Sequence, residues 1–497
     1  MSAEEQLAPN YSKLEDALRS IGYSFEAAVA DVIDNSIDAK ATKILVRLFT
    51  RSDGHLDLAL WDNGEGMTES TLKEAMRFGS DVSQDVERLG KFGLGLKLAS
   101  LSQAKELRVI TARSGGISGR AWLDQGIAKG FSSTLFDTSE CKRLAGEVMP
   151  DHKLSQSGTV VWWSRLYRVG QHHGRADEHA QKLMHRLENY LALAFHRFLG
   201  GRPRKVSITL DIFDQTAGRA GIPIDLDPLD PFGYAETGQR GFPVAMSLDG
   251  PYKDRIAIKA HIWPPNSDAA EYKLPGGSNS RQGFYFYRNN RLIQGGGWNG
   301  IREIEPHSSL ARLEMDIAPD FDVDVSLDVK KVEIHLPPDL AQAIQKAKTS
   351  LGIDFKKYLS IANDAYRTRP VTESELPLIP SKGLPSELVE FLHKKLRIKA
   401  TAKHRDLKFK WRTLNEDTFF EIDRDSGRLY LNQSYRRLLL HGRTGSSADV
   451  PVLKCLLFLV LEDALMSERI SSKVRDHLEL VNTILVEAVK FERERDD

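Results

Sequence analysis

The chain has 497 residues, and its 69 lysines and arginines balance 69 aspartates and glutamates, so its formal net charge is zero. This balance excludes a uniformly basic protein that binds nucleic acid or membranes through its overall charge, although it leaves room for a local basic patch. Two cysteines, Cys141 and Cys455, are too few for a disulfide framework or a four-thiolate zinc site. With no signal-peptide pattern and no apolar run of about 20 residues, we expect a cytoplasmic protein that does not contact the membrane.

The first informative element is a helix expected from Ser24, which can cap it, to about Ala39. Apolar residues recur every four positions along it and predict a buried stripe, whereas the opposite side carries three polar residues: Asp31, Asn35 and Asp38. A side-chain amide oxygen suits Mg²⁺, and a carboxylate one turn earlier on the same face could polarise a water molecule. The alternative is an ordinary amphipathic helix with a solvated acidic face.

Two strands are expected next, over residues 43–49 and 56–61. Leu56, Leu58 and Leu60 occupy every second position of the second strand and are expected to face the interior, and Asp62 is the next residue in this series. Its carboxylate is therefore predicted to be buried and to need a hydrogen-bond partner. The exocyclic amino group of a purine would be such a partner, and Gly64 and Gly66 would let the backbone approach a flat ring. The alternative is a plain Asp-Asn-Gly turn.

A glycine-rich loop, GKFGLGLK over residues 90–97, precedes a helix expected over residues 98–102. Glycines before a helix N-terminus present free backbone N–H groups to an anion, and Lys91 and Lys97 could add positive charge. The loop lacks the Gly-Lys-Ser/Thr of a Walker motif, and no strand leads directly into it as in a Rossmann loop. Further along, Thr159 begins a strand expected over residues 159–163.

In order and spacing, these motifs resemble the GHKL ATPase superfamily, which includes gyrase B-type topoisomerases, heat-shock chaperones, histidine kinases, MutL and MORC proteins. The resemblance covers about residues 12–165 and implies a Bergerat-type α/β sandwich that binds ATP and Mg²⁺. It implies that Asn35 is the Mg²⁺ ligand and Asp31 the general base. It also implies nucleotide contacts from a larger set: Asn35, Asp38, Asp62, Gly64, Gly66, Met67, Gly90, Lys91, Phe92, Gly93, Leu94, Gly95, Lys97 and Thr159.

One residue departs from the pattern of the gyrase, MutL, MORC and chaperone branches, whose general base is usually glutamate. Asp31 is one methylene shorter, which draws the carboxylate back by about 1.5 Å, and a misplacement near 1 Å can cost on the order of 100-fold in rate. Asp34 lies on a different helical face from Asn35, so we do not expect it to substitute. We therefore favour slow ATP hydrolysis, and a nucleotide-gated scaffold with negligible turnover is the alternative.

The middle of the chain predicts a long helix over residues 175–198 and then strand-like segments. Residues 284–293 read as strand, turn and strand, with the turn at Asn289-Asn290, and resemble the domain that follows the ATPase in MutL and MORC proteins. Residues 322–331 predict a strand that ends in Lys330 and Lys331. The resemblance implies that one of these lysines senses the terminal phosphate, and the sequence does not choose between them.

Residues 394–412 carry nine basic residues and one acid, Asp406, with Phe409 and Trp411 interleaved. The basic residues are Lys394, Lys395, Arg397, Lys399, Lys403, Arg405, Lys408, Lys410 and Arg412. Such a segment suits contact with a DNA backbone together with stacking on bases, and the alternative is a solvated basic face. Residues 420–431 predict a hairpin, and residues 451–491 a helical end.

The predicted fold is mixed α/β: a GHKL ATPase domain (1–170), an α+β transducer-like domain (171–368), a proline-rich linker (369–386) and a C-terminal basic, α-rich module (387–497). The resemblance is closest to prokaryotic MORC- and MutL-like proteins. It implies ATP-driven homodimerisation as a clamp or switch on DNA, in an antiviral-defence or restriction-type system with partner subunits. A chaperone-like ATPase that acts on protein is a further alternative, which the basic segment disfavours.

Overall fold

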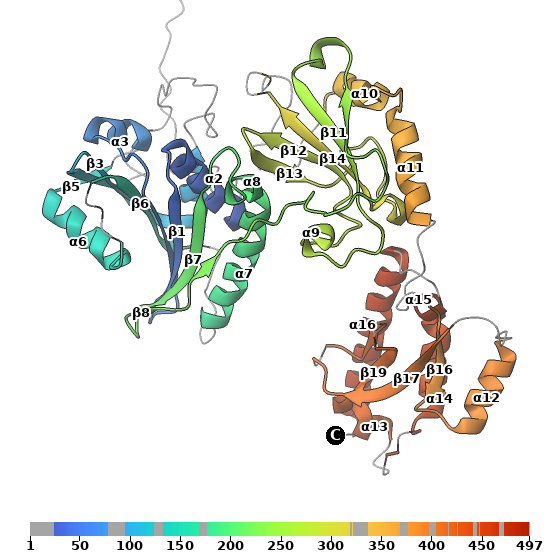
Figure 1. Cartoon of the computed structure of the whole chain (residues 1–497). Helices are drawn as coiled ribbons and strands as arrows, with labels where there is room; N and C mark the ends of the chain where they lie inside the picture. The colour runs from blue at the N-terminus through green and yellow to red at the C-terminus, as the bar shows by residue number, and fades with distance from the viewer. Residues whose placement is uncertain are drawn as a thin grey trace, which may run out of the picture. The chain divides into compact units, whose positions relative to one another are not determined.

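The computed structural model describes residues 24–77, 95–123, 133–152, 154, 156–167, 176–318, 321, 336–367, 376–396, 404–415, 417–424, 426–440, 445–446, 448–466 and 472–496. The chain divides into two compact units, residues 1–367 and 368–497, and each is described here by itself (Figure 1). Within the described part of the chain, no helix is long and apolar enough to cross a membrane.

The first unit begins with a large, mostly antiparallel sheet in the order β5-β4-β3-β6-β2-β1-β7-β8, with β9 also paired to β7. Its strands are β1 (Lys43–Thr50), β2 (Leu56–Asp62), β3 (Ala104–Arg113), β4 (Gly116–Leu123), β5 (Thr134–Phe136), β6 (Gly158–Leu166), β7 (Ser207–Asp214), β8 (Arg219–Ala220) and β9 (Ile224–Asp225). The β1–β7 pair is parallel, and the other described pairs of this sheet are antiparallel.

Helices cover both faces of this sheet (Figure 1). One face packs against α2 (Phe25–Asp38), α3 (Glu69–Met76), α4 (Gly95–Gln103), α7 (Ala176–Ala194) and α8 (His196–Leu199), and the other against α6 (Thr138–Val148). The alternation of β2 explains the two layers, because Leu58 and Leu60 join the core beneath α2 whereas Ala59 joins the core beneath α6.

The second half of this unit is built on a six-stranded sheet, in the order β13-β12-β14-β11-β10-β15. Its strands are β10 (Val244–Ser247), β11 (Ile256–Ile262), β12 (Gly283–Arg288), β13 (Arg291–Gly295), β14 (Ala311–Ile317) and β15 (Lys348–Thr349). Short helices are η1 (Gly250–Tyr252), α9 (Ala270–Lys273) and η2 (Pro306–Ser308), and α10 (Pro338–Lys346) and α11 (Phe355–Arg367) pack on one face. On the other face, Tyr285 of β12 lies in a small core with Leu193 at the end of α7.

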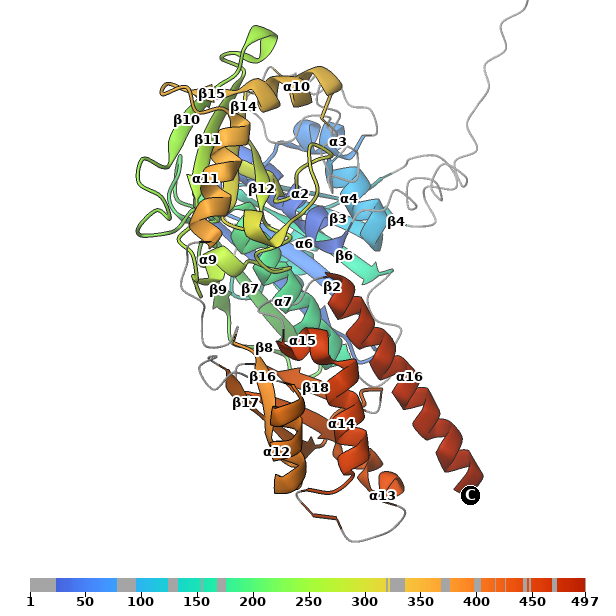
Figure 2. The same cartoon turned by 90° about the vertical axis from the view of Figure 1, so that its right-hand side faces the viewer.

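The second unit contains a four-stranded sheet, β16-β17-β19-β18, backed by helices (Figure 2). Its strands are β16 (Leu378–Lys382), β17 (Arg405–Arg412), β18 (Phe420–Asp423) and β19 (Arg428–Asn432). Its helices are α12 (Ser386–Lys395), η4 (Gln433–Tyr435), α13 (Arg436–Leu439), α14 (Pro451–Val460), α15 (Glu462–Met466) and the long α16 (Ser472–Asp496).

These elements confirm the predicted mixed α/β fold with its helical C-terminal end. Two details differ from the sequence-based expectation. Strand β16 lies inside the segment predicted as a linker, where its backbone pairs with β17. The predicted helix over residues 175–198 is divided, because α7 ends at Ala194 and α8 begins at His196.

Candidate nucleotide site

Helix α2 presents its polar residues in different environments. Ser24 caps the helix as predicted, since its Oγ accepts a hydrogen bond from Ala27 N at 3.1 Å. Asn35 is exposed, whereas Asp31 is buried and Asp38 is half-buried. The exposed amide of Asn35 is therefore available to a ligand, and the carboxylate of Asp31 lies one turn earlier on the helix.

Asp62 ends strand β2 and is only 3% exposed, in agreement with its inward parity. Its carboxylate accepts hydrogen bonds from Gly64 N at 2.8 Å, from Ser36 Oγ at 2.9 Å and from the backbone of Thr159. Burial raises the pKa of Asp62 to about 6, although these three hydrogen bonds act to lower it. The carboxylate is thus ionised at neutral pH, and Ser36 ties it to α2.

Gly66 and its neighbours form a wall beside this carboxylate. Gly66 has φ +69°, and a Cβ atom there would lie 1.8 Å from the carbonyl oxygen of Ala112, so only glycine fits. The next residue, Met67, donates its backbone N–H to Thr111 Oγ1 at 2.9 Å. Thr111 Oγ1 also lies 3.1 Å from Thr159 Oγ1. The turn after β2 is therefore fixed against β3 and β6.

The structure describes only part of the glycine-rich loop. Gly95 is the first residue of α4, and Lys97 is 1% exposed, with its Nζ donating to the carbonyl oxygen of Arg77. Burial lowers the pKa of Lys97 to about 8, against the attraction of Glu74. The remaining predicted loop residues (Gly90, Lys91, Phe92, Gly93 and Leu94) and both phosphate-sensor candidates (Lys330 and Lys331) lie outside the described residues.

Several candidate residues thus gather at one end of the sheet: Asp62, Gly64, Gly66, Met67 and Thr159. Two further residues that the sequence did not single out hold them there. Ser36 lies beside Asn35 on α2, and Thr111 lies near the end of β3. A serine next to the asparagine was visible in the sequence, but the contact of Thr111 joins residues 44 positions apart, which no local pattern shows.

The described residues show no group of three or more His, Cys, Asp or Glu side chains that could hold a metal ion. A single exposed amide on α2 fits a different kind of site, in which Mg²⁺ keeps several water molecules and takes few protein ligands. Asn35 is the described residue that suits such an ion.

Residues 23–149 match the family of histidine kinase-, DNA gyrase B- and HSP90-like ATPases. The N-terminal domain is a GHKL-type ATPase domain. This assignment supports ATP binding. A solved structure described as the N-terminal domain of a DNA repair protein is 17% identical, covers 71% of this chain and 98% of its own, and has a TM-score of 0.43. No curated protein matches the sequence.

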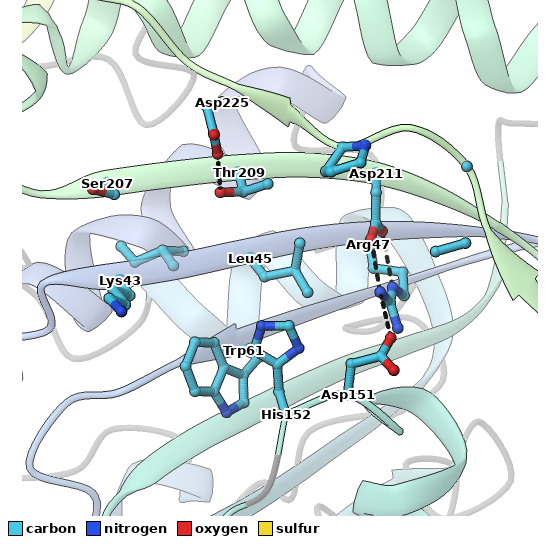
Figure 3. A pocket seen from close by; sticks show the side chains of 14 residues that line it. Lys43, Leu45, Arg47, Trp61, Asp151, His152, Ser207, Thr209, Asp211 and Asp225 are labelled. Atoms are coloured by element: carbon cyan, nitrogen blue, oxygen red, sulfur yellow. Dashed lines mark hydrogen bonds and ion pairs between the residues drawn. The ribbon is translucent and has the colours of Figure 1, made fainter.

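A separate cavity of about 570 Å³ opens on the opposite face of the ATPase sheet (Figure 3). Arg47 of β1 lies beside it and forms two hydrogen bonds with Asp211 of β7, at 2.8 and 2.7 Å. The rings of Trp61 and His152 also line it, with centroids 4.6 Å apart. Because Leu45 and Arg47 alternate with residues that face α2, this cavity lies on the other side of β1 from the candidate nucleotide site.

Proposed function

We propose that the chain binds ATP with Mg²⁺ and hydrolyses it slowly. The observation that carries this proposal is the buried carboxylate of Asp62, held by Gly64 N and Ser36 Oγ at the end of β2. An ionised carboxylate in a buried position is costly unless its acceptor sites are used, and the amino group of adenine would use one of them. Met67 and Gly66 would form the wall beside the base, and Thr159 would lie near it.

Around the phosphates, Asn35 would hold Mg²⁺, which neutralises phosphate charge when bound, and Asp38 would lie at the edge of this site. Asp31 would orient and polarise the attacking water. Gly90, Gly93 and Gly95 would supply backbone N–H groups, flanked by Lys91, Phe92, Leu94 and Lys97. Lys330 or Lys331 would reach the terminal phosphate. The short side chain of Asp31 supports slow turnover.

The proposal is tested by measuring ATP affinity and steady-state turnover for the wild type and for Asn35→Ala and Asp31→Asn variants. We expect Asn35→Ala to abolish the Mg²⁺ dependence of ATP binding, and Asp31→Asn to retain binding while losing turnover. ATP binding without turnover, unchanged by Asp31→Asn, would favour the nucleotide-gated scaffold. A folded wild-type chain that does not bind ATP would exclude the ATPase function altogether.

A second proposal concerns DNA and rests on strand β17. Lys408, Lys410 and Arg412 alternate with Leu407 and Phe409, and the latter two are buried in the core of this unit. The three cations therefore share the face away from that core. Arg428 of β19 pairs in register with Lys408 and adds a fourth positive charge beside them.

The predicted stacking role of the interleaved aromatic residues is wrong. Phe409 is buried in the core, and Trp411 packs against the same core and donates its Nε1 to Asp449 at 3.0 Å. In a strand, residues of one parity face one side, so aromatic residues that alternate with the lysines cannot share their surface. Tyr430, which pairs with Lys410, lies on the cationic face, under the guanidinium of Arg412 at 4.0 Å. We therefore propose contact with the DNA backbone through this face, without base stacking by Phe409 or Trp411.

Charge reversal tests this face. A Lys408→Glu and Lys410→Glu double variant should flatten the dependence of log affinity on log salt concentration by about two units, because two phosphate contacts are lost. Lys356→Glu and Lys357→Glu, at two exposed positions of α11 outside the basic segment, form a matched control with the same change in net charge, and this control should leave the slope nearly unchanged. Equal slopes for the wild type and the β17 variant would discard the site.

We further propose ATP-driven homodimerisation and a MORC- or MutL-like role in antiviral defence, on the sequence resemblance alone. Sedimentation of the full chain with and without a non-hydrolysable ATP analogue tests the dimer. A chain that stays monomeric when saturated with the analogue would exclude it.

A further inference from the structure

One side chain of the β12–β13 hairpin, that of Arg291, contacts the ATPase domain. Its two-residue turn, Asn289-Asn290, has φ values of +46° and +67°, as expected for a tight hairpin that asparagine tolerates. The next residue, Arg291, begins β13 and is 3% exposed. Its Nε lies 3.2 Å from Oδ1 of Asp34, which is 4% exposed on α2.

The surroundings of Arg291 come mainly from the ATPase domain. The guanidinium lies 4.6 Å from the centre of the Phe195 ring, and Nη1 donates to the carbonyl oxygen of Leu292. Burial acts to lower the pKa of Arg291, but the attractions of Asp34, Tyr190 and Asp31 outweigh it, so the pKa is raised. The positive charge therefore acts on both carboxylates, Asp34 by contact and Asp31 through space.

We propose that Arg291 is a positioning residue for ATP hydrolysis. It fixes the rotation of α2 through its contact with Asp34, the residue before Asn35, and so sets the orientation of Asn35 and Asp31. The hairpin that carries it belongs to the six-stranded sheet, so a shift of that sheet would alter the geometry at Asn35 and Asp31. This inference rests on the proposed ATPase function.

A second arginine crosses between the same two parts in the opposite direction and provides a matched control. Arg197 of α8 binds Glu314 at 2.7 Å and Asp316 at 2.5 Å on β14, and lies 3.6 Å over the ring of Tyr287. It thus joins the ATPase domain to the six-stranded sheet through acids that are not on α2. Arg197→Ala therefore removes a positive charge from the junction, as Arg291→Ala does, without changing the contacts of α2.

The test uses the full chain and compares kcat and KM of each variant with those of the wild type. Arg291→Ala should lower kcat by about 10- to 100-fold, the range expected when a catalytic group is misplaced by about 1 Å, with a smaller change in KM. A loss of kcat at nearly constant KM indicates misplaced reacting groups, whereas a loss of ATP binding would raise KM. Arg291→Lys should recover most of kcat, and Arg197→Ala should leave kcat nearly unchanged.

A double variant, Arg291→Met with Asp34→Leu, separates positioning from stability, because apolar residues often replace a buried ion pair without loss of stability. We expect this variant to fold with nearly wild-type thermal stability and still show the lowered kcat. Recovery of wild-type kcat together with stability would show a purely structural pair and overturn the inference. If either variant fails to fold, Arg291→Gln decides, because it removes the ion pair with Asp34, and an unchanged kcat in that variant overturns the inference.

Failure of the proposed function gives a different result. If the wild type binds ATP but shows no turnover, the readout becomes the ratio of ATP affinities with and without Mg²⁺, because Arg291 also positions Asn35. Arg291→Ala should then lower that ratio several-fold, and an unchanged ratio overturns the inference. A wild type that does not bind ATP removes the proposed function and this inference with it.

Discussion

Replacing Asp62 by asparagine should stabilise the folded chain while weakening ATP binding. The asparagine side chain has nearly the same shape, and its oxygen can accept from Gly64 N as the carboxylate does at 2.8 Å. Its amide can donate to Ser36 Oγ, whose hydroxyl is within 3.4 Å of the Val32 carbonyl oxygen and can donate there. The substitution therefore removes a buried charge and keeps hydrogen bonds with Gly64 and Ser36.

The size of the effect follows from the pKa of Asp62, which burial raises from 3.8 to about 6. At about 1.4 kcal/mol per pKa unit, this rise corresponds to a cost of up to about 3 kcal/mol for the ionised carboxylate at pH 7.5. Because the folded pKa is raised, the contribution of Asp62 to stability is fully present below pH 3.8 and is lost as the pH rises through about 6. The advantage of the Asp62→Asn variant should therefore be small at pH 4 and largest above pH 7.

The assay is chemical denaturation of wild type and variant at pH 4 and pH 7.5. Asp57→Asn is the matched control on the same strand, because Asp57 is also buried but pairs with Arg51, at 2.9 Å from Nε, and accepts from Arg165 N at 2.8 Å. Removing that charge leaves the arginine without its partner and should destabilise the chain at pH 7.5. A stability difference between wild type and Asp62→Asn that stays the same at both pH values would refute the reasoning.

ATP binding should change in the opposite direction. The adenine amino group needs an acceptor, and protonation of Asp62 replaces an acceptor by a donor. Wild-type ATP affinity should fall about tenfold between pH 7 and pH 5 through this group, given its pKa of about 6. The phosphates of ATP also titrate, but they do so equally with both proteins, so the difference between wild type and variant isolates Asp62.

Three further predictions concern its neighbours. Gly66→Ala should lower the free energy of unfolding by several kcal/mol and abolish ATP binding, because the added Cβ would lie 1.8 Å from the Ala112 carbonyl oxygen. In the control Gly115→Ala (φ +82°, with nothing within 4 Å), denaturation experiments should show a loss of only about 1 kcal/mol. Ser36→Ala removes a hydrogen bond that lowers the pKa of Asp62, so the pH at which ATP affinity declines should move upward in a titration. The pKa of Lys97 is lowered from 10.5 to about 8 by burial, so the folded chain binds fewer protons than the unfolded chain between these values, and stability should rise with pH across that window. Lys97→Met should remove this rise, and an identical pH dependence in both proteins would contradict the assigned burial.

Local signals predicted much of the fold because their causes are local. The cap at Ser24, the alternation that buries Asp62 and the asparagine turn before Arg291 each depend on a few adjacent residues. The basic segment shows the limit of such reasoning. Its composition alone does not assign residues to the two faces of a strand. Because β17 places alternate residues on opposite faces, Phe409 lies in the core and Trp411 packs against it.

The rest of the candidate site depends on contacts between distant residues, which one sequence cannot show. Thr111 joins β3 to the turn after β2 across 44 positions, and Arg291 meets Asp34 across 257. Neither residue carries a local pattern that distinguishes it from an ordinary strand residue. Their partners become identifiable only when the sheet order places β3 beside β6, and the β12–β13 hairpin beside α2.

Asp34 and Asp62 are both buried carboxylates, but they have different partners in the structure. Asp34 has an arginine within 3.2 Å, so its charge is compensated inside the protein and it has little to gain from a ligand. Asp62 is held by hydrogen bonds, and burial still raises its pKa, so an incoming donor would relieve part of the cost of its charge. The helical-face argument against Asp34 as general base thus gains a second reason, since an attacking water would compete with Arg291 for that carboxylate. Under the proposed function, Asp31 would therefore be the residue of α2 that acts on the attacking water.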